Sequence, residues 1–372
     1  MTLKKFERIP YLDGLRAISI AAVLLGHSAN SIQRLHTPAS RALRILINPE
    51  VGVRVFFVIS GFIITTLLLQ ELENTKKIDI LGFYQRRIAR IFPAFYTYVI
   101  VVLLLKLCGA ATLTWPPLIA AATYTWNYAY FWGATTEKGK LLLEHSWTLS
   151  LEEQFYLLWP ACLLFLNSKI AKYIALLSVV IIPTFRAFQI FSYPLSPRQP
   201  LMMFHTGCDQ IMWGALAAFA YQDYGILKRY FDIKYKWAIP LICVITVYLV
   251  CPFLESRYRP IGLRVSPSLV CMSSAVMILW LLSGRKGLLR RVLESWLLVQ
   301  IGMLSYSLYI WQQMFLVWHR ISFLRFPLNL VAVFIVAFIS YRFIETPMRK
   351  YIRNRFNSAS APASSQIAAE IK

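Results

Sequence analysis

Apolar stretches of about 20 residues recur along almost the whole chain, and short clusters of basic residues separate them. A helix of that length and composition crosses the roughly 30 Å of hydrocarbon in a bilayer. Hydrophobic residues make up 58% of the 372 residues and charged residues only 15%, which is too apolar for a water-soluble domain of this size. The sequence therefore predicts an all-α polytopic membrane protein, whose first partner is the lipid bilayer.

We expect about ten transmembrane helices, with both termini in the cytoplasm. The segment 117–132 is shorter than the others and rich in Tyr, Trp and Asn, so we expect it to be re-entrant or to lie at the interface. Counting it as a crossing would remove the excess of basic residues from the inner loops. The ten spans are expected at 11–31, 51–70, 91–111, 146–166, 172–191, 205–223, 236–254, 265–284, 297–318 and 327–346.

The net charge of +22 comes from basic clusters between apolar runs and not from one soluble face, so we expect no nucleic-acid partner. The six cysteines are scattered through apolar segments without metal-ligand spacing, so we expect no metal site. We expect residues 1–350 to form one transmembrane domain. The remainder, 351–372, is rich in small polar residues toward its end, and we expect a disordered cytoplasmic tail.

The first apolar span carries two ionisable residues, Arg16 and His27. The separation of eleven positions corresponds to about 1,100° of helical rotation and about 16 Å of rise, so both side chains lie on one face. With the amino end inside, Arg16 lies near the cytoplasm and His27 in the outer half of the membrane. An ionisable group at that depth indicates function. The alternative is a histidine that hydrogen-bonds between helices as a packing contact.

Adjacent carboxylates, Glu152 and Glu153, lie in the apolar segment HSWTLSLEEQFYLLWP at 145–160. Adjacent helical residues point about 100° apart, so at most one of them faces a given cavity. We expect both at the depth of His27, where a carboxylate could orient the imidazole of a general base. The alternative is a buried ion pair or a carboxylate at a helix end.

Three arginines, Arg86, Arg87 and Arg90, precede the third span on the cytoplasmic side. Guanidinium groups bind phosphate oxygens in a bidentate manner, and Arg16 on the same side favours a phosphate pocket. The alternative is that the three serve as topology anchors. In the second span, Gly52 and Gly61, the latter beside Ser60, favour close helix packing. Arg54 either extends its side chain outward or faces a cavity.

Seven blocks of the sequence resemble, in order, those of the acyltransferase family 3 membrane proteins. The resemblance covers about Tyr11 to Lys350. It implies transfer of acyl groups, often acetyl from acetyl-CoA, to hydroxyls of surface or secreted carbohydrates. The blocks are YLDGLRAISIAAVLLGH, GVRVFFVISGFIITTLL, FYQRRIARIFP, HSWTLSLEEQFYLLWP, DQIMWGALAA, SYSLYIW and SYRFIETPMRK.

The resemblance also implies roles for single residues. His27 and Glu152 correspond to the family's catalytic histidine and to the glutamate of its W-[ST]-L-S-x pattern, which selects Glu152 over Glu153. Residues expected to bind acyl-CoA are Arg16, Arg86, Arg87 and Arg90, and the expected supporting residues are Asp13, Ser60, Glu153 and Asp209. In two places the chain departs from the family: many members carry an acidic residue at the position of Arg54, and many read W-H-W-P where Trp311 is followed here by Gln312, Gln313 and Met314.

We therefore expect an O-acyltransferase of a bacterial inner membrane. It would move an acyl group, in the simplest case acetyl, from cytoplasmic acyl-CoA to a hydroxyl of an extracytoplasmic carbohydrate or glycolipid. Acyl-CoA would be a co-substrate, with no permanently bound cofactor and no fused SGNH domain. The alternative function is a transporter that exports a sugar-linked or anionic substrate. The oligomeric state stays open.

Overall fold

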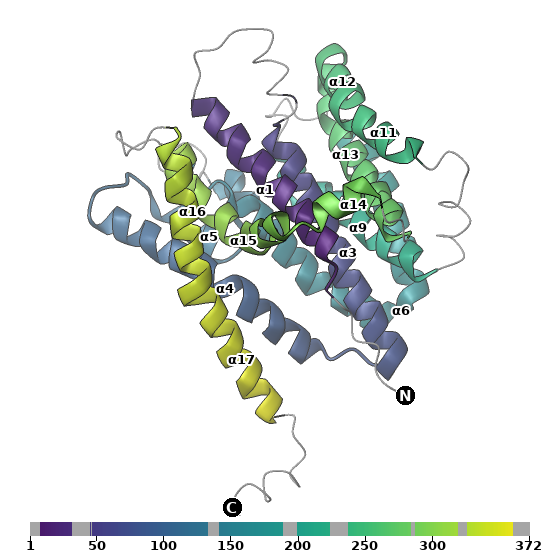
Figure 1. The fold of residues 1–372 in the computed structure, drawn as a ribbon, viewed down its shortest axis with the longest axis horizontal. Coiled ribbons are helices and arrows are strands. Elements are labelled where there is room, and N and C mark those ends of the chain that lie inside the picture. Colours follow the sequence, from purple (N-terminus) through teal and green to yellow (C-terminus); the bar gives the residue numbers. More distant parts are fainter. Residues whose placement is uncertain are drawn as a thin grey trace, which may run out of the picture.

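A computed structural model describes residues 8–31, 45, 47–132, 141–188, 199–223, 237–283, 287–318 and 326–359. Within these ranges the regular structure is helical and contains no strand. Figure 1 shows a bundle of helices in which α1 (Pro10–Ser31) begins on the same side as α17 (Thr346–Ala359) ends. These two helix ends therefore lie on one side of the bundle.

The other long helices of the described ranges form the body of the bundle. Three π-helical turns, η3 to η5, extend helices of the second half of the chain. The remaining elements are α3 (Pro49–Thr75), α4 (Ile80–Leu107), α5 (Trp115–Ala122), η1 (Trp126–Trp132), α6 (Ser146–Phe188), α7 (Gln199–Met202), α8 (Phe204–Gly207), α9 (Asp209–Gln222), α11 (Ala238–Ile245), η3 (Thr246–Val250), α12 (Cys251–Arg257), α13 (Arg259–Leu282), α14 (Leu288–Leu293), α15 (Trp296–Gln312), η4 (Gln313–Val317), α16 (Leu328–Ser340) and η5 (Tyr341–Glu345).

Six helical segments of the described ranges are long and apolar enough to cross a membrane, which indicates an integral membrane protein. The expected count of about ten spans is not confirmed. The spans expected at 146–166 and 172–191 form the two halves of α6, which is broken at Asn167, where φ is 61° and ψ is 165°. The helix in 205–223 is α9, whose 14 residues are about 21 Å long and fall short of the hydrocarbon thickness. The six segments are Pro49–Thr75, Ile80–Leu107, Ser146–Phe188, Ala238–Arg257, Ile261–Leu282 and Leu328–Ile352.

The segment 117–132 divides between α5 and η1. A positive φ of 53° at Tyr124 lies between these two short helices. The eight residues of α5 are about 12 Å long, too short to cross a bilayer. The expectation that this segment does not cross as a transmembrane helix therefore agrees with the structure, whereas its interfacial position stays a prediction.

The carboxyl end of the described chain is helical where we expected the tail to begin. α17 continues to Ala359, nine residues beyond Lys350, so the first part of the expected tail is helical in the structure. Its basic and polar residues are compatible with a helix that extends from the bundle, as Figure 1 shows. Residues 360–372 lie outside the described ranges.

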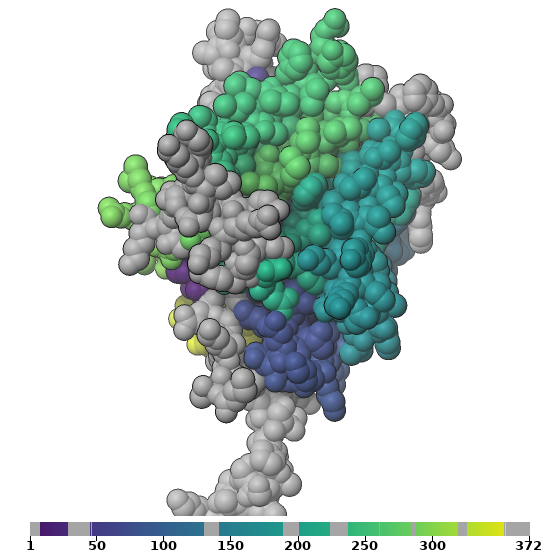
Figure 2. Space-filling model, turned by 90° about the vertical axis from the view of Figure 1, so that its right-hand side faces the viewer, coloured from purple at the N-terminus to yellow at the C-terminus, as the bar shows by residue number. Residues whose placement is uncertain are grey.

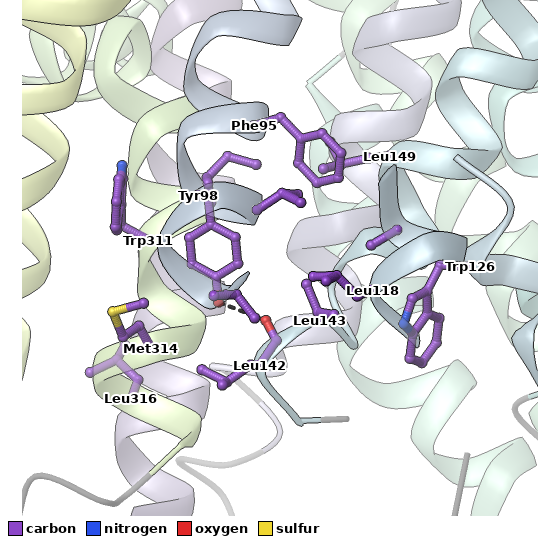
Figure 3. Packing of buried hydrophobic residues seen from close by; sticks show 14 of the residues in the cluster. Phe95, Tyr98, Leu118, Trp126, Leu142, Leu143, Leu149, Trp311, Met314 and Leu316 are labelled. Carbon is purple, nitrogen blue, oxygen red and sulfur yellow. Dashed lines mark hydrogen bonds between the residues drawn. The ribbon is translucent and has the colours of Figure 1, made fainter. Parts of the chain in front are cut away.

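One buried cluster joins α4, α15 and the segment that precedes α6. The Tyr98 hydroxyl of α4 donates to the carbonyl oxygen of Leu142 at 2.6 Å, and its ring meets that of Trp311 edge to face at 5.4 Å. Figure 3 shows these side chains together, with Leu143 beside them. The cluster fixes the carboxyl end of α15 against the amino end of α6, so residues from both ends can share a site.

α3 is a central helix, and it packs against α1, α6, α9 and α13. A Cβ atom added at Gly61 would lie 2.1 Å from the carbonyl oxygen of Ile211, and one added at Gly214 would lie 2.1 Å from that of Val58. Backbones approach this closely only where neither helix carries a side chain at the contact. The prediction that the glycine beside Ser60 serves helix packing is confirmed.

α6 presents an apolar surface to its surroundings on both sides of its break at Asn167. Figure 2 shows α6 in teal along one edge of the molecule. Phe165, Tyr173 and Val180 are 79%, 64% and 59% exposed. A continuous band of exposed large apolar residues is expected on a surface that faces lipid.

Candidate functional site

A cavity that we call the arginine cavity lies between α1, α3, α4, α6 and α15. Arg16, Arg87 and Arg90 line it, so three of the four arginines expected to bind acyl-CoA share one space. The Arg87 guanidinium lies 5.2 Å from the centre of the Tyr156 ring, a cation–π contact that fixes its position. The cavity therefore concentrates positive charge inside the helix bundle.

A second cavity, the end cavity, adjoins the arginine cavity at the amino end of α1. Both are lined by Arg16, Ile63 and Arg90. Asp13 lies between two basic groups of the end cavity, 2.7 Å from Nε of Arg8 and 3.6 Å from a terminal nitrogen of Arg16. Asp13 is thus the partner of two arginines, Arg8 and Arg16.

A third cavity, the histidine cavity, adjoins the arginine cavity on its other side. Both are lined by Val53 and Tyr309. The polar residues around the histidine cavity come from α1, α3, α9, the segment before α6, α15 and η4. They are His27, Glu50, Arg54, Glu144, His145, Gln210, Gln312 and Gln313. The three cavities form a series that begins at Arg8 and ends at His27.

The His27 ring is held by a residue that the sequence did not identify as a partner. Its Nδ1 lies 2.6 Å from Oε1 of Gln312, which is fully buried at the end of α15. An amide oxygen only accepts hydrogen bonds, so Nδ1 carries the hydrogen and Nε2 of the neutral ring carries the lone pair. The signal in the sequence was the departure from W-H-W-P after Trp311. The structure adds a second one, a π-helical turn directly after Gln312, which is a feature common at functional sites.

The Glu152 carboxylate accepts a hydrogen bond from the Ser60 hydroxyl at 2.8 Å. Tyr156 in turn donates to the Ser60 oxygen at 3.1 Å. All three residues line the arginine cavity together with Arg16. The structure therefore joins Glu152 and Ser60, and it places both beside the arginines.

Glu152 lines the arginine cavity, whereas His27 lines the histidine cavity and has Gln312 as its partner. Glu152 follows His145, which lines the histidine cavity, by seven helical residues, or about 10 Å along α6. Its partner Ser60 is about 15 Å along α3 from Glu50, another residue of the histidine cavity. The residue at which α6 begins therefore determines how far Glu152 lies from the histidine cavity along this helix. Glu153 is not among the residues that line the three cavities.

Arg86 lies apart from the other arginines. Its side chain is 62% exposed and 3.9 Å from both Glu71 and Asp79. It does not line the three cavities, although Arg87 and Arg90 on the same helix do. The structure therefore gives a cavity position to two of the three arginines of this cluster.

Asp209 forms a fully buried ion pair with Arg186, at 2.8 Å and 3.2 Å from its two terminal nitrogens. Arg186 also donates to the carbonyl oxygens of Arg264 and Thr206 and to the Ser268 hydroxyl. These contacts join α6, α8, α9 and α13 and satisfy the donors of the guanidinium group. Asp209 thus supports the packing of the bundle and lines none of the three cavities.

Arg54 faces the histidine cavity and is 7% exposed, which decides between the two orientations expected for it. Its guanidinium lies 2.7 Å from the Glu50 carboxylate one helical turn away. In the described ranges, no three His, Cys, Asp or Glu side chains lie together as metal ligands would. The site thus offers an imidazole, cations, carboxylates and amides as its reacting and binding groups.

Comparison with known proteins identifies one family. The model of the acyltransferase domain (acyltransferase family 3) matches residues 9–341. O-acetyltransferase OatA of Staphylococcus aureus strain NCTC 8325 is 28% identical over 381 residues, which cover 94% of this chain and 60% of the relative. A putative O-acetyltransferase of S. aureus strain COL is 28% identical over 396 residues, with 93% and 58% covered.

A peptidoglycan O-acetyltransferase OatA of Listeria monocytogenes serovar 1/2a is 26% identical over 375 residues, with 92% of this chain and 56% of the relative covered. The chain thus spans 56% to 60% of the length of these relatives. No solved structure matches. Because the family model covers nearly the whole chain, this integral membrane protein belongs to acyltransferase family 3.

Proposed function

We propose that the protein is a membrane O-acyltransferase, which moves an acyl group from cytoplasmic acyl-CoA to a hydroxyl of an extracytoplasmic carbohydrate or glycolipid. The observation that supports this most is the series of three adjoining cavities, in which Arg16 and Arg90 line one end and His27 the other. Such a series suits a long, thin donor with an anionic head and a reactive tip. The acetyl group is the simplest acyl group that fits this proposal.

The arginines would bind the phosphates of acyl-CoA. Guanidinium groups form strong, charge-assisted hydrogen bonds to phosphate oxygens, and Arg16, Arg87 and Arg90 are already gathered in one cavity. The pantetheine arm would then pass Val53 and Tyr309, the residues common to the arginine and histidine cavities. Along α1 this path covers about 16 Å.

His27 would act as the general base. Its Nε2 lone pair, fixed by the Gln312 contact on Nδ1, takes the proton of the acceptor hydroxyl as the hydroxyl oxygen attacks the thioester carbonyl carbon. The C–S bond then breaks, the thiolate of CoA takes that proton from the imidazolium, and an ester and free CoA remain. Glu152 would act at a distance from this step, by offsetting the positive charge of Arg16 and Arg87.

A surface glycan is the acceptor class that we propose. Glu50, Arg54 and Glu144 around the histidine cavity supply both donors and acceptors for sugar hydroxyls. One relative is named a peptidoglycan O-acetyltransferase, so peptidoglycan is the first glycan to test. The proposal requires the end cavity to open to the cytoplasm and the histidine cavity to face outward, with both termini cytoplasmic and the protein in a bacterial inner membrane.

The test uses purified protein in detergent, labelled acetyl-CoA and soluble peptidoglycan fragments. We expect the release of free CoA and of an O-acetylated glycan, and His27→Ala should abolish both while the variant still unfolds at the wild-type temperature. Acylation by folded His27→Ala at the wild-type rate would overturn the proposal. Accumulation of glycan inside vesicles without acyl transfer would instead favour the transporter.

A further inference from the structure

His145, the residue before α6, is buried with unused hydrogen-bonding capacity. It is 4% exposed, and neither ring nitrogen has a hydrogen-bond partner among the described residues. Aromatic rings hold it instead, with Tyr98 at 5.1 Å and Tyr309 at 5.8 Å, both edge to face. Buried polar groups are nearly always hydrogen-bonded, so a ring that is fixed but unpaired indicates that a ligand is its partner.

Gln312 shows the same feature on the other side of the histidine cavity. Its Oε1 accepts from His27, whereas its Nε2 is buried without a hydrogen-bond partner among the described residues. Gln312 and His145 both line the histidine cavity, and His145 lies near enough to His27 for the two rings to interact electrostatically. Two residues with unused, buried donors therefore line the cavity that holds the proposed base.

Other side chains around this cavity already have partners within the protein. Arg54 pairs with Glu50. Gln210 donates to the carbonyl oxygens of Leu201 and Gly207, and Gln313 donates to that of Leu141. This contrast separates His145 and Gln312 from the side chains that maintain the cavity wall.

We propose that Nε2–H of Gln312 and one ring N–H of His145 form an oxyanion site. The inference rests on the proposed acyl transfer. When the acceptor oxygen bonds to the thioester carbonyl carbon and His27 takes its proton, the carbonyl π electrons move to oxygen. The two N–H groups donate to that oxygen until the C–S bond breaks and the carbonyl re-forms. Donors already fixed in place cost no reorganisation in the transition state.

The matched variant is His145→Phe, which keeps an aromatic ring between Tyr98 and Tyr309 and removes both nitrogens. We expect kcat for acetyl transfer to peptidoglycan fragments to fall about 10²- to 10³-fold, the usual effect of one lost oxyanion donor. The control is His205→Phe, because the His205 ring stacks on Tyr128 and does not line the three cavities. It should retain the wild-type kcat.

Binding separates this inference from the proposed function. S-ethyl-CoA lacks the carbonyl, whereas the hydrated trifluoromethyl ketone analogue of acetyl-CoA imitates the tetrahedral intermediate. We expect His145→Phe to bind S-ethyl-CoA as the wild type does and to bind the hydrated ketone about 10²-fold more weakly. Equal loss or equal retention of both ligands would overturn the oxyanion site. A wild-type protein that binds neither ligand would instead overturn the proposed function.

Discussion

Nδ1 of His27 lies 2.6 Å from Oε1 of Gln312, although 285 positions separate the two residues in the chain. The contact exists because α1 packs along α15, and Gln312 is the last residue of α15 before a π-helical turn. It determines which nitrogen of the ring presents a lone pair to the histidine cavity.

Removing this contact should slow the reaction without weakening donor binding. Gln312→Met keeps the volume of the side chain but leaves Nδ1 of His27 without its acceptor. We expect kcat to fall at least about 100-fold, because the base loses the contact that orients it and the proposed oxyanion donor of Gln312 is removed as well. The KM for acetyl-CoA should stay within about twofold of the wild type. Steady-state CoA release measures both constants, and an unchanged kcat would contradict the role of Gln312.

The arginines offer a matched pair of substitutions on one helix. Arg90 lines both the arginine and end cavities, whereas Arg86 is exposed beside Glu71 and Asp79. We expect Arg90→Ala to weaken acetyl-CoA binding about 10- to 100-fold, the value of one charge-assisted hydrogen bond to phosphate. Arg86→Ala should bind as the wild type does. Titration calorimetry with acetyl-CoA checks this, and equal effects of the two substitutions would contradict the cavity assignment.

The junction between two cavities can be closed at Val53. This residue lines both the arginine and histidine cavities, so Val53→Trp places a large ring where the pantetheine arm would pass. We expect acetyl transfer to fall at least about 100-fold, while 3′,5′-ADP, which carries only the phosphate end of the donor, still binds. Val53→Ala is the control and should remain active. Full activity of Val53→Trp in a folded protein would mean that the donor takes another route.

The ion pair of Asp209 and Arg186 should govern stability more than catalysis. Asp209→Leu leaves a buried guanidinium unpaired, which costs about 3–5 kcal/mol in comparable buried pairs. We therefore expect a lower unfolding temperature in detergent, with acetyl-CoA affinity retained by the folded fraction. The double variant Asp209→Leu with Arg186→Met should recover part of the loss, and thermal unfolding compares the two. If Asp209→Leu were as stable as the wild type but inactive, Asp209 would have a direct catalytic part.

Local pattern in the sequence was sufficient for some parts of the site. The spacing of Arg16 and His27 follows from helical geometry alone, and both residues line the series of cavities. Asp13 is close enough in sequence to pair with Arg16 within one turn. The close approach at Gly61 was likewise readable, because small residues in an apolar helix mark a packing face.

Other parts depend on tertiary packing that no local pattern contains. The cavity that Glu152 lines depends on how α6 packs against α3, where Ser60 is its partner. Gln312 contacts His27 only because α15 packs along α1. Arg86 and Arg87 differ in exposure because adjacent helical residues point about 100° apart, and the sequence did not fix which face α4 turns inward. The break of α6 at Asn167 falls between the two spans expected at 146–166 and 172–191, although neither Pro nor Gly marks that position.

The most direct test of the account is the sidedness of acyl transfer. Purified protein is reconstituted in one orientation into sealed vesicles, with labelled acetyl-CoA on the face of the end cavity and peptidoglycan fragments only on the opposite face. We predict labelled O-acetyl groups on the fragments and free CoA on the donor face, with neither formed by His27→Ala vesicles. Product that forms only when donor and acceptor are on the same face would contradict a path from the arginines to His27.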